Sequence, residues 1–423
     1  MSGFIYRLKL IIKDETLSKK VLFVLGALIV FRFMSNIPIP AAVNTGLDSF
    51  MADNAALGFM NLLTGGGLAS ISIMMLGVGP YITASIIMQL MTMMSDKVKV
   101  MYHEEGEAGK KKFIQISRKL SIALAVVQGF GLIMFLKSQG FIAEISSFEL
   151  MTNVIIVAAG SVLLMWVGEL ITEFGIGNGV SLIIFAGIVA GMPATVGQLI
   201  FQFDTVNIPL YIGFIVAAVA IIAGIVTMTE AERPVPITYA KQVRGSKTYG
   251  GVSTYLPLRV NQAGVIPIIF ALSILIFPQM VVNFLVNVDN LMIQNIATTA
   301  KTFLDNQLFT SIIYFVLVFG FTFFYTAVTF DPESIATNLQ KNGAFIPGVR
   351  PGRSTSEFIA KILTRITLVG AVFLGLVAVL PFAMVAITGN QAMALGGTAL
   401  LIVVSVVIDL IKKIEAQLSM REY

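Results

Sequence analysis

Apolar stretches of similar length, separated by polar loops, are the main pattern of this sequence of 423 residues. Ten of these stretches come near the roughly 20 residues that an α-helix needs to cross the hydrocarbon core of a bilayer. They cover residues 21–38, 72–94, 120–136, 152–172, 180–200, 209–228, 264–286, 310–329, 366–386 and 393–411. The pattern therefore predicts an all-α integral membrane protein with ten transmembrane helices.

Basic residues are concentrated on one side of these predicted spans. Of the 28 Lys and Arg residues, 25 lie in the two terminal tails and in the loops after the second, sixth and eighth spans. Only Lys137 and Lys301 fall in the opposite loops, and Arg32 lies within the first span. Because loops rich in Lys and Arg remain in the cytoplasm, we expect a multi-pass protein of the cytoplasmic membrane with both termini cytoplasmic.

The predicted spans divide into two halves of five, residues 1–200 and 201–423. Because each half has an odd number of spans, two halves with a shared fold would be inverted relative to each other. We therefore expect two pseudo-symmetric inverted halves around a central pore. A secondary transporter with an inverted five-plus-five repeat is one function that fits this arrangement.

Two long polar loops lie in the second half, at residues 229–263 and 330–365. In the first, alternating β-branched and aromatic residues between Gly and Pro predict a β-hairpin. The second begins with the helix-capping sequence DPES and ends in a turn rich in Pro and Gly that displays Arg350 and Arg353. We expect these loops to protrude from the membrane and to bind a partner.

Composition narrows the classes of function. Charged residues make up 12% of the chain, about half of their share in an ordinary globular protein. The chain contains no cysteine, and its single histidine, His103, lies in a charged loop, so the sequence predicts no metal site, no disulfide and no cofactor. No pair of aspartates or Ser/His dyad is found at membrane depth, which argues against an intramembrane protease.

The segment before the second span is broken by glycine. Gly65, Gly66 and Gly67 interrupt an apolar run, and Gly77, Gly79 and Pro80 break it again. Backbone groups at such breaks cannot be satisfied by lipid, so the segment must lie within protein or line an aqueous cavity. It is either a kinked span with a re-entrant loop or a short mobile half-helix that folds into the bundle from outside.

Ionisable residues within spans are functional candidates, because a charge at mid-bilayer is costly. Here they are Arg32, Glu169 and Asp409. Glu169 and Asp409 lie near predicted cytoplasmic ends, where placement at a helix end explains them without a transport role. A carrier coupled to ions or protons would bring several carboxylates to the midplane, so this pattern weakens the transporter hypothesis.

Several longer strings of residues occur in a fixed order along the chain. They are PYITASIIMQL at 80–90, GIGNG at 175–179, YAKQ at 239–242, STYLPLRVNQAGVIP at 253–267, IPGVRPG at 346–352 and GGTALLIVV at 396–404. On these strings the chain resembles the bacterial SecY family over nearly its whole length. The resemblance implies a protein-conducting channel, not an enzyme, that translocates unfolded polypeptides and releases transmembrane helices into lipid.

The same resemblance implies partners and residue roles. The partners would be SecE, SecG, the SecA ATPase, the ribosome, pre-proteins, nascent membrane proteins and membrane lipids. A ring of apolar side chains would line the pore waist, formed by Val78, Ile82, Ile184, Ile269, Ile274 and Ile402. The glycine-rich segment 61–72 would be the plug that closes the outer funnel.

Two further sets of residues follow from the resemblance. A lateral gate, through which helices leave for lipid, would form between the second and third spans and the seventh and eighth, with Thr83, Gln128 and Asn261 along its seam. Arg244 and Arg350 match basic residues that contact SecA or the ribosome.

Overall fold

The structure, a computed structural model, describes residues 14–42, 64–201, 208–240, 253–286, 290–388 and 391–419. A few residues between these ranges are also described, namely 47, 57, 58, 60, 61, 242–244, 247–249 and 251.

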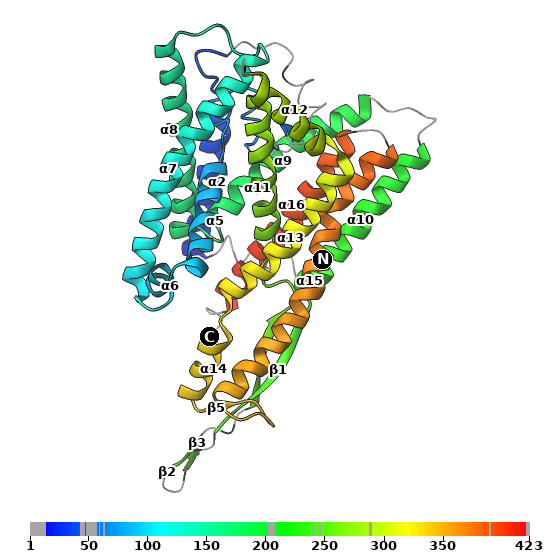
Figure 1. Ribbon diagram of the computed structural model, residues 1–423. Helices are drawn as coiled ribbons and strands as arrows, with labels where there is room; N and C mark the ends of the chain where they lie inside the picture. The colour runs from blue at the N-terminus through cyan, green and yellow to red at the C-terminus, as the bar shows by residue number, and fades with distance from the viewer. Residues whose placement is uncertain are drawn as a thin grey trace.

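Long apolar helices make up most of the chain (Figure 1). In chain order they are α2 (Glu15–Met34), α5 (Gly79–Met94), α7 (Gly106–Ser138), α8 (Ser147–Phe174), α9 (Gly179–Phe201), α10 (Ile208–Glu230), α11 (Ile266–Leu285), α13 (Gln307–Thr329), α15 (Arg353–Thr388) and α16 (Gln391–Ser419). Each overlaps one predicted span. Among the described residues, four helical segments are long and apolar enough to cross a membrane, at Gly106–Ser138, Ser147–Phe174, Gln307–Lys341 and Arg353–Met384. The number of crossings and the inverted symmetry of the two halves remain predictions.

The second predicted span begins later than its hydropathy suggested. The helix α5 starts at Gly79, whereas residues 73–78 form turns. Gly77 has a φ of 57°, in the left-handed region that a continuing right-handed helix cannot use, and Pro80 then occupies the first turn of α5. The span predicted at 72–94 is therefore a turn segment followed by a short helix.

Three shorter helices in the part of the chain that the structure describes lie outside the predicted spans. The sequence predicted α14 (Pro332–Lys341), and the cap is confirmed because Asp331 accepts a hydrogen bond from the backbone N–H of Glu333 at 3.0 Å. It did not predict α6 (Asp96–His103) or α12 (Leu291–Asp305). Both lie within loops of mixed polarity that are too short or too polar to read as spans.

The predicted β-hairpin is confirmed and is part of a larger unit. Strand β1 (Glu232–Tyr239) pairs antiparallel with β4 (Ser253–Arg259), and its tip carries the short strands β2 (Gln242–Arg244) and β3 (Lys247–Tyr249). Strand β5 (Ala344–Phe345), from the second long loop, adds to the other edge of β1. The two long loops are therefore joined by backbone hydrogen bonds.

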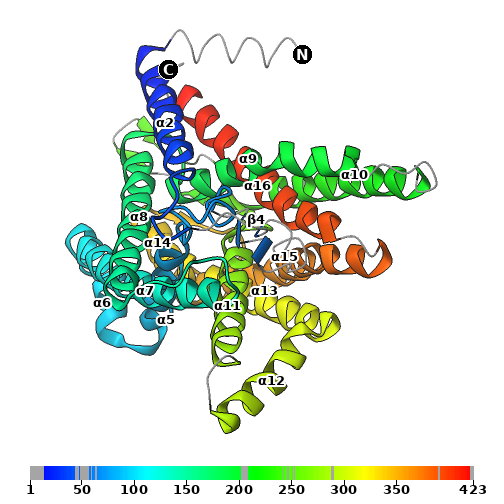
Figure 2. The ribbon, with the colours of Figure 1, turned by 90° about the horizontal axis from the view of Figure 1, so that it is seen from above.

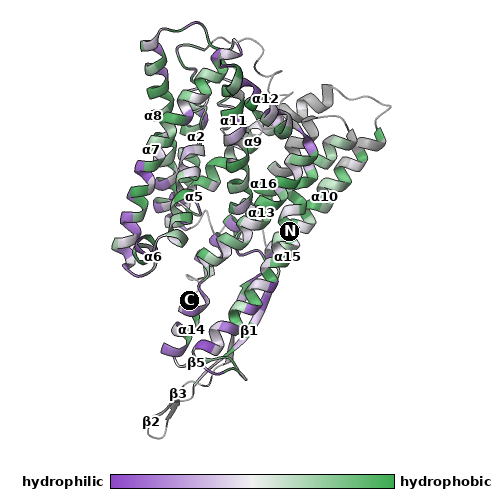
Figure 3. Ribbon diagram, viewed as in Figure 1, coloured by the Kyte–Doolittle hydropathy of each residue, from purple (hydrophilic) through white to green (hydrophobic). Residues whose placement is uncertain are grey.

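An apolar cluster fixes this sheet to the first turns of α15. One face of the hairpin contributes Val235 and Leu258, and α15 contributes Ile359, Ile362 and Leu363. The sheet and α14 lie at one end of the molecule with α6, and α12 lies at the opposite end (Figure 1). We call the end with the sheet the basic end, because its loops carry most of the Lys and Arg residues. Hydrophilic residues also gather there, at α6, α14 and the start of α15 (Figure 3).

Candidate functional site

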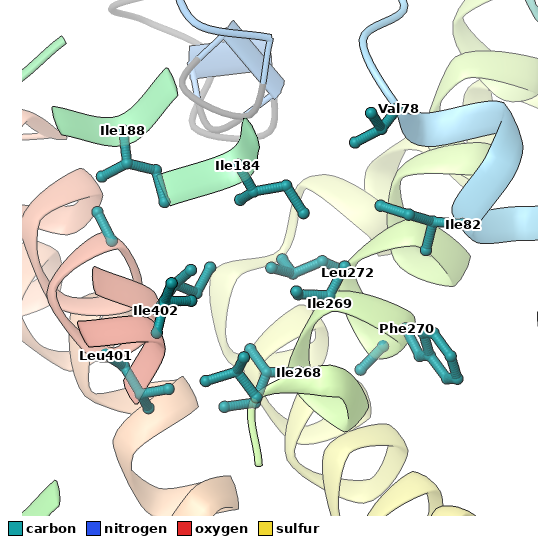
Figure 4. Packing of buried hydrophobic residues seen from close by; sticks show 14 of the residues in the cluster. Val78, Ile82, Ile184, Ile188, Ile268, Ile269, Phe270, Leu272, Leu401 and Ile402 are labelled. Carbon is teal, nitrogen blue, oxygen red and sulfur yellow. The ribbon is translucent and has the colours of Figure 1, made fainter. Parts of the chain in front are cut away.

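Side chains from four helices meet in the middle of the bundle. The largest cluster of buried apolar residues includes five of the six predicted ring residues: Val78, Ile82, Ile184, Ile269 and Ile402. They come from the N-terminus of α5, from α9, from α11 and from α16, and Figure 4 shows them extending toward a common centre. Helices far apart in the chain thus contribute aliphatic groups to one layer.

The sixth predicted ring residue is placed less centrally. Ile274 is only partly buried and packs against the cluster from outside its fully buried core. It lies five residues after Ile269, which is about 140° around the helix axis, so the two side chains do not share a face of α11. Its role in a ring remains a prediction.

Two residues of this layer were not predicted. Ile188 and Leu272 are buried in the same cluster and lie beside the ring residues in Figure 4. Ile188 follows Ile184 by four residues and Leu272 follows Ile269 by three, which are the spacings of one helix face. That periodicity was the signal that could have found them.

Residues 64–72 of the predicted plug segment 61–72 are held by hydrogen bonds to the chain after α2, and residues 62 and 63 lie outside the described residues. Described residues 64–78 form a series of turns that includes Gly65, Gly66 and Gly67. The backbone N–H of Ile39 donates to the carbonyl of Ile71 at 2.9 Å, and the hydroxyl of Ser70 donates to the carbonyl of Ser35 at 2.8 Å. The guanidinium of Arg32, on α2, donates to the carbonyl of Gly65.

Gly65 is required for two reasons. Its φ of 67° lies in the left-handed region, which costs a residue with a Cβ atom about 1–2 kcal/mol. A Cβ atom at this position would also lie 2.7 Å from the ring of Phe31 on α2 and 3.3 Å from the Cα of Gly187 on α9. The segment therefore approaches the same stretch of α9 that carries Ile184 and Ile188.

The helices expected to form the lateral gate lie next to one another. Helix α5 packs on α7, α11 contacts both of them, and α13 contacts α5. Among the described residues, no hydrogen bond joins Thr83, Gln128 and Asn261. The hydroxyl of Thr83 donates to the carbonyl of Gly79 in its own helix at 3.0 Å, and Asn261 is buried with its Oδ1 atom unpartnered among the described residues.

The two predicted docking residues lie at the basic end. Arg244 ends β2 and pairs with Lys247 across the hairpin tip; its side chain is outside the described set. Arg350 is exposed in the turn before α15, and its carbonyl accepts a hydrogen bond from the hydroxyl of Thr355 at 2.9 Å. Arg353 nearby is paired with Glu357 at 3.1 Å.

The charged residues within predicted spans have structural partners. Glu169 on α8 forms a two-point ion pair with Arg118 on α7, with both N–O distances at 2.8 Å. Asp409 pairs with Lys413 one turn later on α16, at 2.7 Å. Arg32 donates a hydrogen bond to the carbonyl of Gly65, so each of the three charged groups within the predicted spans has a partner in the protein. No cluster of three potential metal ligands is present among the described residues.

Comparisons with known proteins agree on one family. The family model for SecY matches residues 72–411. The chain is 42% identical to the protein translocase subunit SecY of Halalkalibacterium halodurans, with 96% of each chain covered. It is 39% identical to that of Streptomyces scabiei, with 97% of each covered, and 38% identical to that of Mycobacterium bovis, covering 100% of this chain and 99% of the relative.

Solved structures share the fold. A structure described as a protein-conducting channel superposes with a TM-score of 0.63 at 18% identity, covering 93% of this chain and 91% of the other. A structure from work on the plug domain of SecY superposes with a TM-score of 0.65 at 19% identity and the same coverage. Canine Sec61 in a ribosome–channel complex superposes with a TM-score of 0.60 at 18% identity, also with the same coverage. The fold is thus that of SecY and Sec61 channels, and the sequence matches show that the chain belongs to the SecY family of protein translocase subunits.

Proposed function

We propose that this chain forms a protein-conducting channel that passes unfolded polypeptides across the bacterial cytoplasmic membrane and releases transmembrane helices into its lipid. The observation that carries the proposal is the apolar layer to which α5, α9, α11 and α16 each contribute (Figure 4). An apolar ring offers an ion no replacement for its hydration shell. Aliphatic side chains can still make close contacts around a passing polypeptide, because dispersion attraction is not directional.

Family membership separates this function from the rival considered above. The chain is a translocation channel subunit and not an enzyme. A secondary transporter with a five-plus-five repeat is not favoured, because the curated relatives named above are protein translocase subunits. The pairing of Glu169 with Arg118 also leaves that carboxylate engaged rather than open to a coupling ion.

In this proposal each part of the site has one role. Val78, Ile82, Ile184, Ile269 and Ile402 form the constriction, joined by Ile188 and Leu272. Residues 61–72, with Gly65 packed against Phe31 of α2 and Gly187 of α9, form the plug, and their hydrogen bonds to Arg32 and to residues 35–39 hold it seated. The contact of α11 with α5 and α7 is the lateral gate.

The basic end faces the cytoplasm in this proposal, with both termini on that side. Lys and Arg in short loops are retained there. The joined loops at this end, with Arg244 and Arg350, bind SecA or the ribosome, since guanidinium groups suit carboxylates and RNA phosphates. SecE and SecG complete the membrane complex. Canine Sec61 and yeast Ssh1 have been solved in complexes with ribosomes, which supports a ribosome as one partner.

Reconstitution tests the function directly. The chain is placed in vesicles with SecE, SecG and SecA, and a radiolabelled pre-protein is added with ATP. We expect the pre-protein to become protected from external protease only when ATP and this chain are both present. Flux of small solutes driven by an ion gradient, with no protected polypeptide, would refute the proposal.

Cysteine pairs test the lateral gate and suit a chain that has no native cysteine. Pairs are scanned between α5, starting at Thr83, and α11. A disulfide requires Cα atoms within about 7 Å, so crosslinking in the idle channel reports contact. We expect the crosslink to block release of transmembrane helices into lipid and a reductant to restore it. Normal integration through an oxidised, fully crosslinked channel would exclude this exit path.

A further inference from the structure

Helix α12 connects α11 to α13 at the end of the molecule opposite the basic end (Figure 1). Asn290 caps its start by accepting a hydrogen bond from the N–H of Met292 at 3.0 Å. Only Asn306 separates it from α13, and the side chain of Asn306 caps α13 through the N–H of Leu308 at 3.1 Å. The two helices form a defined corner, and α12 projects outward from the bundle when seen from above (Figure 2).

One edge of α12 is exposed and, except for Thr299 at its border, apolar. Met292 is 75% exposed, Ile296 65% and Phe303 58%. Their spacing of four and seven residues places the three side chains within about 40° of one another on the helix. A second edge packs on the protein through Ala297, which is 2% exposed.

The opposite face of α12 is mainly polar. Its polar members are Gln294, Asn295, Thr298, Lys301 and Thr302, and Leu291 at the start of the helix lies on the same side and is 77% exposed. The helix thus carries the positive side chain of Lys301 away from the apolar edge. It has the separation of faces typical of a helix that lies at a membrane surface, without an excess of basic residues.

The apolar edge is continuous with the outward face of α13. The ring of Phe303 contacts that of Phe309, with 5.8 Å between ring centroids. Leu308, Phe309, Ile312 and Val316 are exposed along α13. This helix belongs to a segment long and apolar enough to cross a membrane, so we expect its exposed face to meet acyl chains.

From this continuity we propose that α12 is an interfacial helix, with Met292, Ile296 and Phe303 inserted at the boundary between headgroups and acyl chains of the outer leaflet. The inference rests on the orientation given under the proposed function. Lipid is the proposed occupant, because the apolar edge of α12 leads directly onto the lipid-facing surface of α13. Since the apolar edge lacks cationic groups, insertion does not require anionic lipid. The helix would anchor the corner between α11 and α13 in the plane of the membrane.

Tryptophan fluorescence tests the depth of α12. The chain has a single tryptophan, Trp166, which is replaced by Phe. Ile296→Trp then reports on the apolar edge, and Thr298→Trp is the matched control on the polar face of the same helix. Both positions are exposed, so neither substitution disturbs packing. The protein, in complex with its membrane partners, is placed in phosphatidylcholine vesicles whose acyl chains are brominated near the headgroup or near the chain end.

We expect the Ile296→Trp signal to be quenched about twofold or more by bromine near the headgroup, with weaker quenching by bromine at the chain end. Thr298→Trp should instead be quenched by aqueous acrylamide. Adding phosphatidylglycerol should leave both results unchanged. The inference is overturned if both tryptophans respond equally to acrylamide, or if Ile296→Trp is shielded from acrylamide without any bromine quenching, which would indicate a protein partner.

Translocation measured in the same vesicles separates this inference from the proposed function. Vesicles that translocate pre-protein but leave Ile296→Trp in water overturn the role of α12 alone. Vesicles in which Ile296→Trp is quenched by lipid but no pre-protein is translocated overturn the channel function alone. Met292→Trp provides a second probe on the same edge and should repeat the pattern of Ile296→Trp.

Discussion

Removing the Arg32 side-chain donor should loosen the predicted plug. Arg32 donates from α2 to the carbonyl of Gly65, the point at which the segment approaches Phe31 and α9. In Arg32→Met the side chain keeps its length along α2 but has no donor. The carbonyl of Gly65 then loses a charged partner, while the hydrogen bonds of Ile71 and Ser70 to residues 35–39 remain.

The size of the effect follows from the exposure of this pair. A hydrogen bond with a charged partner contributes about 1.5–3 kcal/mol, and partial exposure to solvent favours the lower figure. About 1.4 kcal/mol corresponds to a factor of ten in an equilibrium constant. We therefore expect the fraction of channels with a displaced plug to rise about tenfold in Arg32→Met. Ser70→Ala, which removes the bond to Ser35, should raise the displaced fraction further, although not independently, because the hydroxyl of Ser35 itself donates to the carbonyl of Arg32.

Resting ion conductance in planar bilayers measures the displaced fraction. Arg32→Lys retains a cationic donor and should lie between wild type and Arg32→Met. Equal amounts of folded, inserted protein in each variant are confirmed first by detergent extraction and size-exclusion chromatography. Resting conductance equal to wild type in Arg32→Met, and also in its combination with Ser70→Ala, would refute the idea that these contacts seat the plug.

Three further predictions concern the ring, the docking loop and helix packing. Ile402→Asn should hydrate the constriction and raise resting ion leak, because exclusion of ions depends on an unbroken apolar layer; unchanged leak would remove Ile402 from the constriction. In a co-sedimentation assay, Arg350→Glu should weaken SecA or ribosome binding about tenfold without loss of insertion. Arg353→Glu should have a smaller effect in the same assay, because the side chain of Arg353 is already paired with Glu357. Gly160→Ala places a Cβ atom 2.0 Å from the carbonyl of Ile73 and should lower stability in a thermal melt by about 1–3 kcal/mol, while Gly26→Ala, with no atom within 4 Å of its Cβ, should not.

Hydropathy and capping predicted the long helices and α14, and alternating β-branched and aromatic residues predicted the hairpin, because these elements depend on local sequence. The long apolar runs became α7, α8, α13 and α15, and the DPES cap became α14. Strand β5 could not be predicted, since it is two residues long and exists only by pairing with β1 about 100 residues earlier. Helix α12 was missed because its polar and apolar residues are separated by face and not by position in the chain.

Local sequence predicted less of the candidate site than of the fold. A buried isoleucine in an apolar helix is usually a packing residue, and only contact between helices distant in sequence distinguishes Ile184 or Ile402 from its neighbours. Resemblance to a family supplied these positions, whereas helix periodicity would have added Ile188 and Leu272. The bond from Arg32 to Gly65 depends on how a turn segment folds back onto α2, which no pattern in the sequence records.

Helix α15 connects the sheet to the helix bundle without interruption. It runs for 36 residues from Arg353 to Thr388, about 54 Å at 1.5 Å per residue. Its first turns are clamped to the sheet through Ile359 and Ile362, and its later turns lie against α13, where the ring of Phe315 covers Gly375. The helix is continuous between these two sets of contacts, so it has no hinge there that would absorb a sideways load on the sheet. We therefore expect a load applied at the loops to be transmitted to α13 inside the bundle.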